Sequence, residues 1–488
     1  MANKYLYITL LAILGFNGEA QALSNLFAAA DGEDTHSAPR LVVGITIDRL
    51  RSDFLEAYAP LYTERGFRLL MQEGRVYSNV AYPFTPVDRA SAIAAVTTGT
   101  TPYYNNIGGV QWLNRETLRP IGCVDDPRYP GLLTTDNGSP AHIATSTLGD
   151  ELKLATDGKA IVYAIAPWRD AAVLSAGHAA DLALWIDYAQ GSWCTSQYYT
   201  QTAPQWVRTF NRQHGTIRQH ERTNLEVTEL AEQCVAGTFI GRDDVTDLLW
   251  LTYDAGVELT NSQQTTEETY VQLDISISQL INYVEQKLGR DNVVFFVTGT
   301  GSRESASKTA YETYRIPTGT FYMNRAANLL NMYLGALWGS DNYVEATYRQ
   351  QIFLNRKLLD TKKADWSQVL TQCQEIVAMM DGVSNVYTSL QLLTSQSPEF
   401  QKMRMGIAPR HCGDLMIEVA PGWSIMNEDT QENIAPSASQ APFPLIVYGN
   451  GTQAERITTP ITTDRIAPTI CSAIHIRAPN ASTAAPLF

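Results

Sequence analysis

Several acidic side chains lie where an α/β protein would place functional groups. Asp48 directly follows residues 41–47, a continuous apolar and β-branched run that is typical of a strand buried on both faces of a parallel sheet. The carboxyl ends of such strands are where α/β folds bind ligands. Oxygen ligands from carboxylates suit Ca²⁺ or Mg²⁺. The side chains that could supply such a site are Asp48, Asp88, Asp254 and Glu258, with Ser91 or Thr85 as a nucleophile beside them.

The strand and helix patterns that would position these groups alternate along the chain. Strand-like runs recur at 41–47, 160–165, 247–253, 292–298, 415–419 and 444–448, and helical patterns include 54–73 and 267–288. This alternation predicts an α/β fold with a central, mostly parallel sheet and helices on both faces. Residues 303–405 are rich in helix formers, aromatics and glutamine, which predicts a mainly helical insertion or cap between core segments 41–302 and 406–488.

The N-terminus indicates export. Lys4 precedes an apolar run at 5–16 and the small-x-small site at 20–22, so residues 1–22 are predicted to be a signal peptide and 23–40 a linker. The apolar run is too short for a stable bilayer anchor, so we do not expect this chain to be an integral membrane protein. The formal charge of −14 argues against a nucleic-acid partner, because no basic stripe is available to neutralise phosphates.

Cysteine and histidine residues are scattered. None of the six cysteines forms a CxxC pair or a Cys/His cluster, which excludes a zinc ribbon. In an exported chain an even cysteine count permits disulfides, whereas buried free thiols are the alternative, and the long spacings favour neither.

Several segments, in this order, resemble the alkaline phosphatase superfamily, with the phosphate-irrepressible alkaline phosphatases and the type I phosphodiesterases/nucleotide pyrophosphatases as the nearest branch. They include VVGITIDRLRSDFL at 42–55, TTGTTPYYNNIGG at 97–109, AVLSAGHAADLALWID at 172–187 and GDLMIEVAPGW at 413–423. The resemblance spans about residues 41–480 and implies an alkaline-phosphatase-like sandwich. It also implies a two-zinc site, held by Asp and His, that activates a Thr or Ser nucleophile.

Most of the implied metal ligands are missing. The family's first metal Asp matches Asp48, and its Asp-x-x-x-His pair falls on Asp254 and Glu258. The remaining ligand positions fall on Thr300, Gly301 and Pro442, none of which offers the expected carboxylate or imidazole. We therefore expect no bound zinc and no other cofactor, with Ca²⁺ or Mg²⁺ at the remaining carboxylates as the alternative.

The groups that act on phosphate are replaced as well. The nucleophile position falls on Arg89, whose guanidinium has no lone pair to attack phosphorus. The family's phosphate-binding Asn falls on Val110. Its Lys-x-Arg pair falls on Trp168 and Asp170, although Arg169 could be a shifted substitute. Because unpaired buried carboxylates are costly, we expect Arg89 to fill the former metal cavity and pair with Asp48, Asp254 or both. The alternative is that Arg89 reaches solvent and Asp88 turns inward.

These substitutions favour an exported, catalytically inactive phosphatase-like protein with a binding or assembly role in the cell envelope. The periplasm or outer-membrane periphery of a Gram-negative bacterium is the expected location, with other envelope proteins as partners. One alternative is a phosphomonoesterase or phosphodiesterase with a rebuilt metal site, and another is a small-ligand binder that uses the old pocket.

Overall fold

A large, mostly parallel sheet forms the centre of the chain, as the sequence predicts. The computed structural model describes residues 38–218, 223–256, 265–301, 313–434 and 441–488, of which residues 39–488 form one compact unit. The predicted signal peptide, most of the linker and Glu258 lie outside the described residues. The sheet runs in the order β19-β2-β18-β10-β1-β9-β6-β7-β8-β5, with β20 also paired to β2.

The five neighbouring strands at the middle of the sheet are parallel. They are β10 (Val293–Gly299), β1 (Leu41–Asp48), β9 (Asp247–Asp254), β6 (Val162–Ile165) and β7 (Leu182–Asp187). Antiparallel pairings extend the sheet on both sides. On one side β10 pairs with β18 (Phe443–Gly449), which pairs with β2 (Arg75–Ala81); on the other β7 pairs with β8 (Ser192–Ser196), which pairs with β5 (Gly131–Leu132). The short strands β19 (Glu455–Ile457) and β20 (Ile461–Thr462) lie beyond β2.

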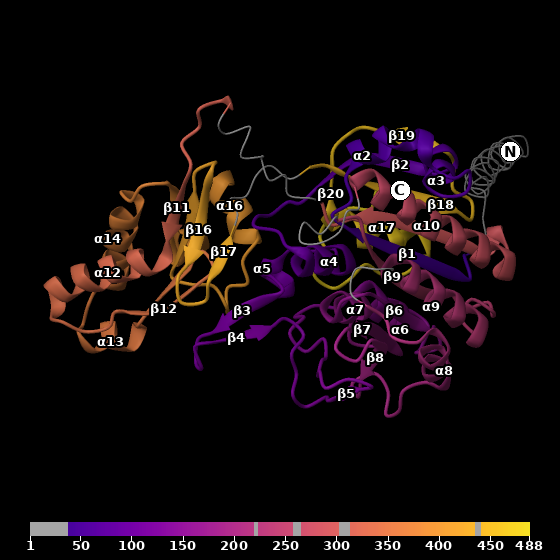
Figure 1. Cartoon of the computed structure of the whole chain (residues 1–488), viewed down its shortest axis with the longest axis horizontal. Coiled ribbons are helices and arrows are strands. Elements are labelled where there is room, and N and C mark those ends of the chain that lie inside the picture. Colours follow the sequence, from indigo (N-terminus) through magenta and orange to yellow (C-terminus); the bar gives the residue numbers. More distant parts are fainter. Residues whose placement is uncertain (1–37, 219–222, 257–264, 302–312, 435–440) are drawn as a thin grey trace, which may run out of the picture. The chain divides into compact units, whose positions relative to one another are not determined.

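Helices cover both faces of this sheet (Figure 1). One face packs on α4 (Arg89–Thr98), α6 (Leu148–Ala155), α7 (Arg169–Ala176) and α17 (Ile466–Ala473). The other packs on α2 (Ser52–Ala57), α3 (Phe67–Glu73), α8 (Gln205–His214), α9 (Thr223–Gly237) and α10 (Thr266–Leu288). Successive strand residues point to opposite faces, so Val42 joins the first layer and Val43 the second.

The segment predicted as one helix at 54–73 is broken, and that prediction is wrong. Helix α2 ends at Ala57, a 3₁₀ turn covers Ala59–Leu61, and α3 starts only at Phe67. Pro60 cannot donate a backbone hydrogen bond within a longer helix, and Gly66 precedes the second helix as its N-cap. The Cβ of any larger residue at 66 would lie about 2.0 Å from an Asp274 oxygen, so only glycine fits there.

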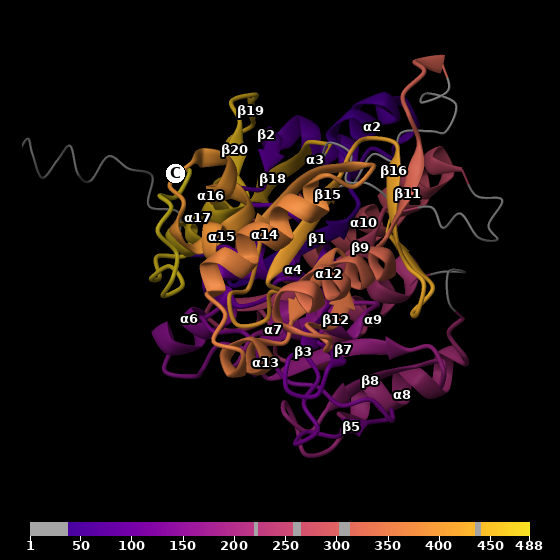
Figure 2. The same cartoon turned by 90° about the vertical axis from the view of Figure 1, so that its left-hand side faces the viewer.

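The region expected to be a helical insertion contains strands as well as helices. The strands form two small sheets, β12-β13-β15-β14 and β11-β16-β17. Helices α12 (Met323–Trp338) and α14 (Trp366–Ala378) pack on them around a separate apolar core (Figures 1 and 2). We call residues 313–434 the lobe. Its remaining elements are β11 (Gly319–Tyr322), β12 (Val344–Tyr348), β13 (Gln351–Leu354), α13 (Arg356–Thr361), β14 (Val383–Thr388), α15 (Ser389–Thr394), α16 (Pro398–Met405), β15 (Leu415–Val419), β16 (Trp423–Asn427) and β17 (Glu432–Ile434).

The strand predicted at 415–419 is present, but it does not belong to the central sheet. It is β15, and its hydrogen-bonding partners are β13 and β14. The boundary expected at residue 405 therefore falls inside the lobe, and the core resumes only with β18. Local hydrophobicity predicts a strand but not the partners with which it pairs.

A buried ion pair ties the lobe to the hairpin of β3 (Gln111–Asn114) and β4 (Arg119–Gly122). Asp414 is fully buried, and its carboxylate accepts from Arg356 at 2.6 Å and lies 3.0 Å from the Arg115 guanidinium. Arg115 also donates to the Cys412 carbonyl at 3.3 Å. A charge held this deeply needs such partners.

Two other features bear on the predictions made above. All six cysteines are free thiols, five of them buried and Cys412 half-buried. Within the described part of the chain, no helix is both long enough and apolar enough to span a membrane.

The tie between lobe and core predicts a stability effect. Replacing Arg115 by Met should lower the free energy of unfolding by about 2 kcal/mol, because Asp414 would keep only one of its two guanidinium partners. Arg119→Met, at an exposed position of the same hairpin, should change it by less than about 0.5 kcal/mol. Urea denaturation of the three proteins measures the difference, and equal stabilities would contradict a role for Arg115 in joining lobe and core.

Candidate active site

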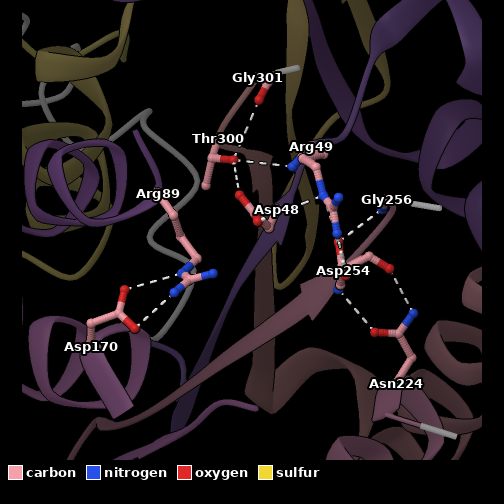
Figure 3. Close-up of polar contacts among 9 residues, drawn as sticks. All are labelled: Asp48, Arg49, Arg89, Asp170, Asn224, Asp254, Gly256, Thr300 and Gly301. Atoms are coloured by element: carbon pink, nitrogen blue, oxygen red, sulfur yellow. Dashed lines mark hydrogen bonds and ion pairs between the residues drawn. The ribbon is translucent and has the colours of Figure 1, made fainter. Parts of the chain in front are cut away.

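Three polar residues meet at the carboxyl ends of adjacent central strands. Strand β1 pairs in parallel with both β9 and β10, which places Asp48 beside Asp254 and Ile47 beside Gly299. Thr300 follows β10 and donates its amide to the Ile47 carbonyl at 3.2 Å. Asp48, Asp254 and Thr300 therefore converge, as the resemblance implies for the remains of a metal site (Figure 3).

Asp254 is neutralised by a neighbouring arginine that the sequence analysis did not single out. The Arg49 guanidinium donates through Nη2 to both Asp254 oxygens, at 2.7 and 2.9 Å, and through Nε to one of them at 3.1 Å. The Gly256 amide donates to the same carboxylate at 2.8 Å, and Asn224 binds the Asp254 backbone (Figure 3). Asp254 is thus held by paired, charge-assisted hydrogen bonds.

The backbone adapts to this arginine. Arg49 has φ 63°, a left-handed conformation that side-chain-bearing residues seldom adopt. A Cβ at position 256 would lie about 1.7 Å from the Arg49 guanidinium carbon, so Gly256 leaves the space in which the guanidinium lies. These two features were readable in the sequence as an Asp-Arg pair ending a strand and a glycine two residues after Asp254, but neither by itself predicts a contact.

Asp48 is satisfied by Thr300. The Thr300 hydroxyl donates to Asp48 at 2.5 Å and accepts the Arg49 amide at 3.1 Å, and Arg49 Nε lies 3.9 Å from the Asp48 carboxylate. Burial, and then the negative charge of Asp254, raise the pKa of Asp48 to about 6, although Arg89, Thr300 and Arg49 oppose the shift. The residue at a lost ligand position therefore stabilises the carboxylate that remains.

Arg89 does not pair with Asp48 or Asp254, and that prediction is wrong. Its guanidinium donates to both oxygens of Asp170 at 3.0 Å and lies 4.2 Å over the ring of Trp168. Arg89 begins α4 and Asp170 lies in the first turn of α7, so the two helix starts face each other (Figure 3). Asp170 lies within hydrogen-bonding distance of the Arg89 guanidinium and, like Asp48 or Asp254, can accept two parallel hydrogen bonds from it. Its negative charge is also favoured at the N-terminus of α7.

The three residues of this contact occupy positions that the resemblance singles out together. Arg89 stands at the nucleophile position, and Trp168 and Asp170 stand at the positions of the phosphate-binding Lys-x-Arg pair. The structure thus brings together a cation where the family has a nucleophile, and a carboxylate and an aromatic ring where it has cations. The positive charge of Arg89 is paired with the negative charge of Asp170, and the Trp168 ring packs against the guanidinium.

The other proposed site residues serve the scaffold. Asp88 does not turn toward Asp48; it caps α4 by accepting the Ser91 amide at 3.0 Å and also accepts the Val110 amide at 2.7 Å. Ser91 is fully buried, with its hydroxyl engaged by this cap. The Thr85 amide donates to the Lys402 carbonyl at 3.1 Å.

The remaining positions are not brought into a metal site. Arg169 is no substitute for the lost phosphate-binding cations, because it pairs with Asp125 and donates to the Asn137 carbonyl at 2.6 Å. The Pro442 carbonyl, just before β18, accepts a hydrogen bond from the Ser52 amide at 3.0 Å. Gly301 has no side chain to bind a metal, and its φ of 74° is one that glycine adopts readily.

The two-zinc site implied by the family does not fit these residues. Zinc needs three or more protein ligands in a tetrahedral arrangement. In the part of the chain that the structure describes, no group of three or more His, Cys, Asp or Glu side chains is placed to hold a metal ion. The carboxylates of Asp254 and Asp48 already accept hydrogen bonds from Arg49 and Thr300, so these residues do not form a zinc site.

Comparison with known proteins identifies the family. Residues 42–442 match the sequence profile of the type I phosphodiesterase / nucleotide pyrophosphatase family. The chain belongs to this family. It is 25% identical to alkaline phosphatase PafA of Elizabethkingia meningoseptica over 92% of this chain and 94% of that protein. It is 23% identical to alkaline phosphatase PhoV of Synechococcus elongatus over 99% and 98% of the two chains.

The fold agrees with this assignment. The crystal structure of wild-type PafA superposes with a TM-score of 0.81 at 24% identity, covering 92% of this chain and 98% of that one. The alkaline-phosphatase-like architecture expected from the sequence is therefore confirmed. This member of the type I phosphodiesterase / nucleotide pyrophosphatase family keeps the fold, and its strand ends carry Asp48, Asp254 and Thr300 in the arrangement described above.

The Arg49–Asp254 pair predicts a loss of stability on substitution. Arg49→Gln should lower the free energy of unfolding by about 2 kcal/mol, since it leaves the mostly buried Asp254 carboxylate beside Asp48 without its cation. Arg40→Gln, which removes a pair with the exposed Asp244, should cost less than about 1 kcal/mol. Chemical denaturation at neutral pH measures both. If the two variants lose equal stability, Arg49 is not the neutralising cation of this site.

The Arg89–Asp170 pair predicts energetic coupling between α4 and α7. Arg89→Thr and Asp170→Asn should each lower the free energy of unfolding. The double variant should lose about 1–2 kcal/mol less than the sum of the two single losses, because removing both charges leaves neither one unpaired. A double-mutant cycle on the free energy of unfolding gives this term. Strictly additive losses would show that the two side chains do not interact in solution.

Proposed function

We propose that this chain is a catalytically inactive member of its phosphoesterase family with a binding or assembly role. The observation that carries the proposal is the Arg49 guanidinium, bound to Asp254 through three hydrogen bonds and 3.9 Å from Asp48. In this arrangement Asp254 is already paired with a fixed cation of the chain itself, and Asp48 accepts the hydroxyl proton of Thr300, so neither carboxylate is free for a metal.

The groups that would perform the chemistry support the same proposal. Hydrolysis of a phosphoester by covalent catalysis needs an activated nucleophile and positive charge around the phosphoryl oxygens. Arg89 provides no nucleophile, and its charge is directed to Asp170. Thr300 is 3% exposed, donates its hydroxyl proton to Asp48 and accepts from Arg49, so it presents no free oxygen to a substrate.

A phosphomonoesterase or phosphodiesterase with a rebuilt metal site is the second candidate. It is favoured by the relatives PafA and PhoV, which are both named alkaline phosphatases and match this chain nearly end to end. Such a site would recruit Ca²⁺ or Mg²⁺ through Asp48, Asp254 and Glu258 and would first have to displace Arg49.

The location and partners belong to the proposal too. The basic residue, short apolar run and small-x-small site of the first 22 residues support export to the periplasm or the outer-membrane periphery. Other envelope proteins are then the partners available to an inactive, exported fold, and co-purification from a native envelope tests for them.

An activity assay tests the proposal. Purified protein, equilibrated in turn with Zn²⁺, Mg²⁺ and Ca²⁺, is assayed with 4-nitrophenyl phosphate and bis(4-nitrophenyl) phosphate. We expect the same residual rate as for the matched double variant Asp48→Asn/Asp254→Asn, in which neither β1 nor β9 ends in a carboxylate. A rate at least tenfold above that variant, with any of the three ions, would overturn the inactive assignment and establish the hydrolase.

A further inference from the structure

A cavity of about 310 Å³ lies between the core and the lobe, and neither Asp48 nor Asp254 is part of its lining. Its core wall comes from the segment before α4, including Val87 and Asp88, and from strand β3 with Trp112. Its lobe wall comes from the β12–β13 hairpin, including Arg349, and from β15 and β17. The volume is that of a site for a small organic molecule.

The two walls are joined by direct contacts, so the cavity is formed in advance of any ligand. Tyr348 donates to Gln111 across it at 3.4 Å, and His411 stacks on Trp112 with ring centroids 4.6 Å apart and an interplanar angle of 17°. The buried Arg115–Asp414 pair joins the same two parts of the chain. A pre-formed site avoids the ordering cost that a mobile one would incur on binding.

The charges on the walls disfavour a phosphate group. Arg349 lies between two carboxylates, with Nη1 3.8 Å from Asp88 and Nε 3.4 Å from Glu432. Burial, and then the electrostatic effects of the neighbouring His142 and Arg410, lower the pKa of His411 to about 4, so His411 is uncharged at neutral pH. Two carboxylates against one guanidinium give the lining a net negative charge, and a dianionic ligand would be repelled.

The other lining groups suit a ring with hydrogen-bonding substituents. Trp112, Tyr348 and the thioether of Met416 offer flat and polarizable surfaces to an aromatic ring. Gln111 and Gln351 add amide groups that donate and accept hydrogen bonds. This mixture of apolar surface and a few polar groups is typical of small-molecule sites.

We propose that this cavity binds an uncharged, ring-containing organic molecule with hydroxyl or amide groups, and that it discriminates against phosphate esters. The inference deepens the binding role proposed above by giving it a site and a ligand class. It does not depend on whether the strand-end residues are catalytically active, because the cavity shares none of its walls with Asp48, Asp254 or Thr300.

Ligand-observed NMR and calorimetry with the full chain test the proposal. The neutral probes are 4-nitrophenyl β-D-glucopyranoside and 4-hydroxybenzamide, and 4-nitrophenyl phosphate is the charged counterpart of the first. We expect at least one neutral probe to bind saturably and at least tenfold more tightly than the phosphate. Failure of both neutral probes, or equal binding of the phosphate, would overturn the proposal.

Variants locate the binding. Asn433→Trp adds a large side chain at the exposed rim of the cavity and should weaken binding of the neutral probe at least tenfold, whereas Asn385→Trp, on an exposed position of β14 outside the lining, should not. Gln111→Trp blocks the opposite wall if Asn433→Trp does not fold. Unchanged binding in a folded rim variant would place the probe elsewhere and refute the site.

The charge argument has its own variant. Glu432→Gln should narrow the preference for the neutral probe over the phosphate severalfold, and Glu345→Gln, on β12 outside the lining, should leave it unchanged. An unaltered preference in Glu432→Gln would contradict discrimination by charge. Release of 4-nitrophenol from the phosphate in the same samples would count against the inactive assignment alone, so the two proposals fail separately.

Discussion

Two carboxylates at the ends of adjacent parallel strands set the constraint on which the candidate site depends. Asp48 and Asp254 are paired in register and mostly buried, and burial together with the charge of Asp254 raises the pKa of Asp48. A metal ion is one way to neutralise such a pair. Here the neutralising charge is Arg49, which follows Asp48 directly in the chain. The strained backbone at Arg49 and the glycine at 256 are consequences of fitting a guanidinium into this space.

In the cluster of Arg89, Asp170 and Trp168 it is a mostly buried cation that needs a partner of opposite charge. Arg89 at the start of α4 needs a negative partner, and Asp170 at the start of α7 provides it, with the Trp168 ring below the guanidinium. Where the family resemblance implies a nucleophile facing two cations, this chain has a cation facing a carboxylate. In both clusters the charged side chains have hydrogen-bonding partners within the chain: Arg49 and Thr300 for Asp254 and Asp48, and Asp170 for Arg89.

The lobe adds a second kind of surface to the fold. Its attachment rests on Asp414, which is fully buried and draws guanidinium groups from both the lobe and the core hairpin. That tie keeps the hairpin of β12 and β13 against β3 and leaves a cavity whose charges differ from those a phosphoesterase presents to its substrate. The proposed absence of phosphoesterase chemistry and the presence of a shaped cavity are compatible, since function lies in sites and not in the fold.

The sequence by itself determined the central strands β1, β9 and β10 and the helix at 266–288, because these depend on local hydrophobic patterns. It also predicted the loss of the family's ligands, which depends on residue identity. The sequence did not predict which residues pair with the charged side chains. Arg89 had several carboxylates within plausible reach, and only the packing of α4 against α7 selected Asp170. Likewise Leu415–Val419 was readable as a strand, but its place in the lobe depended on pairing with β13 and β14. Ion pairs and strand partners join residues far apart in the chain, so they are decided only when the chain is folded.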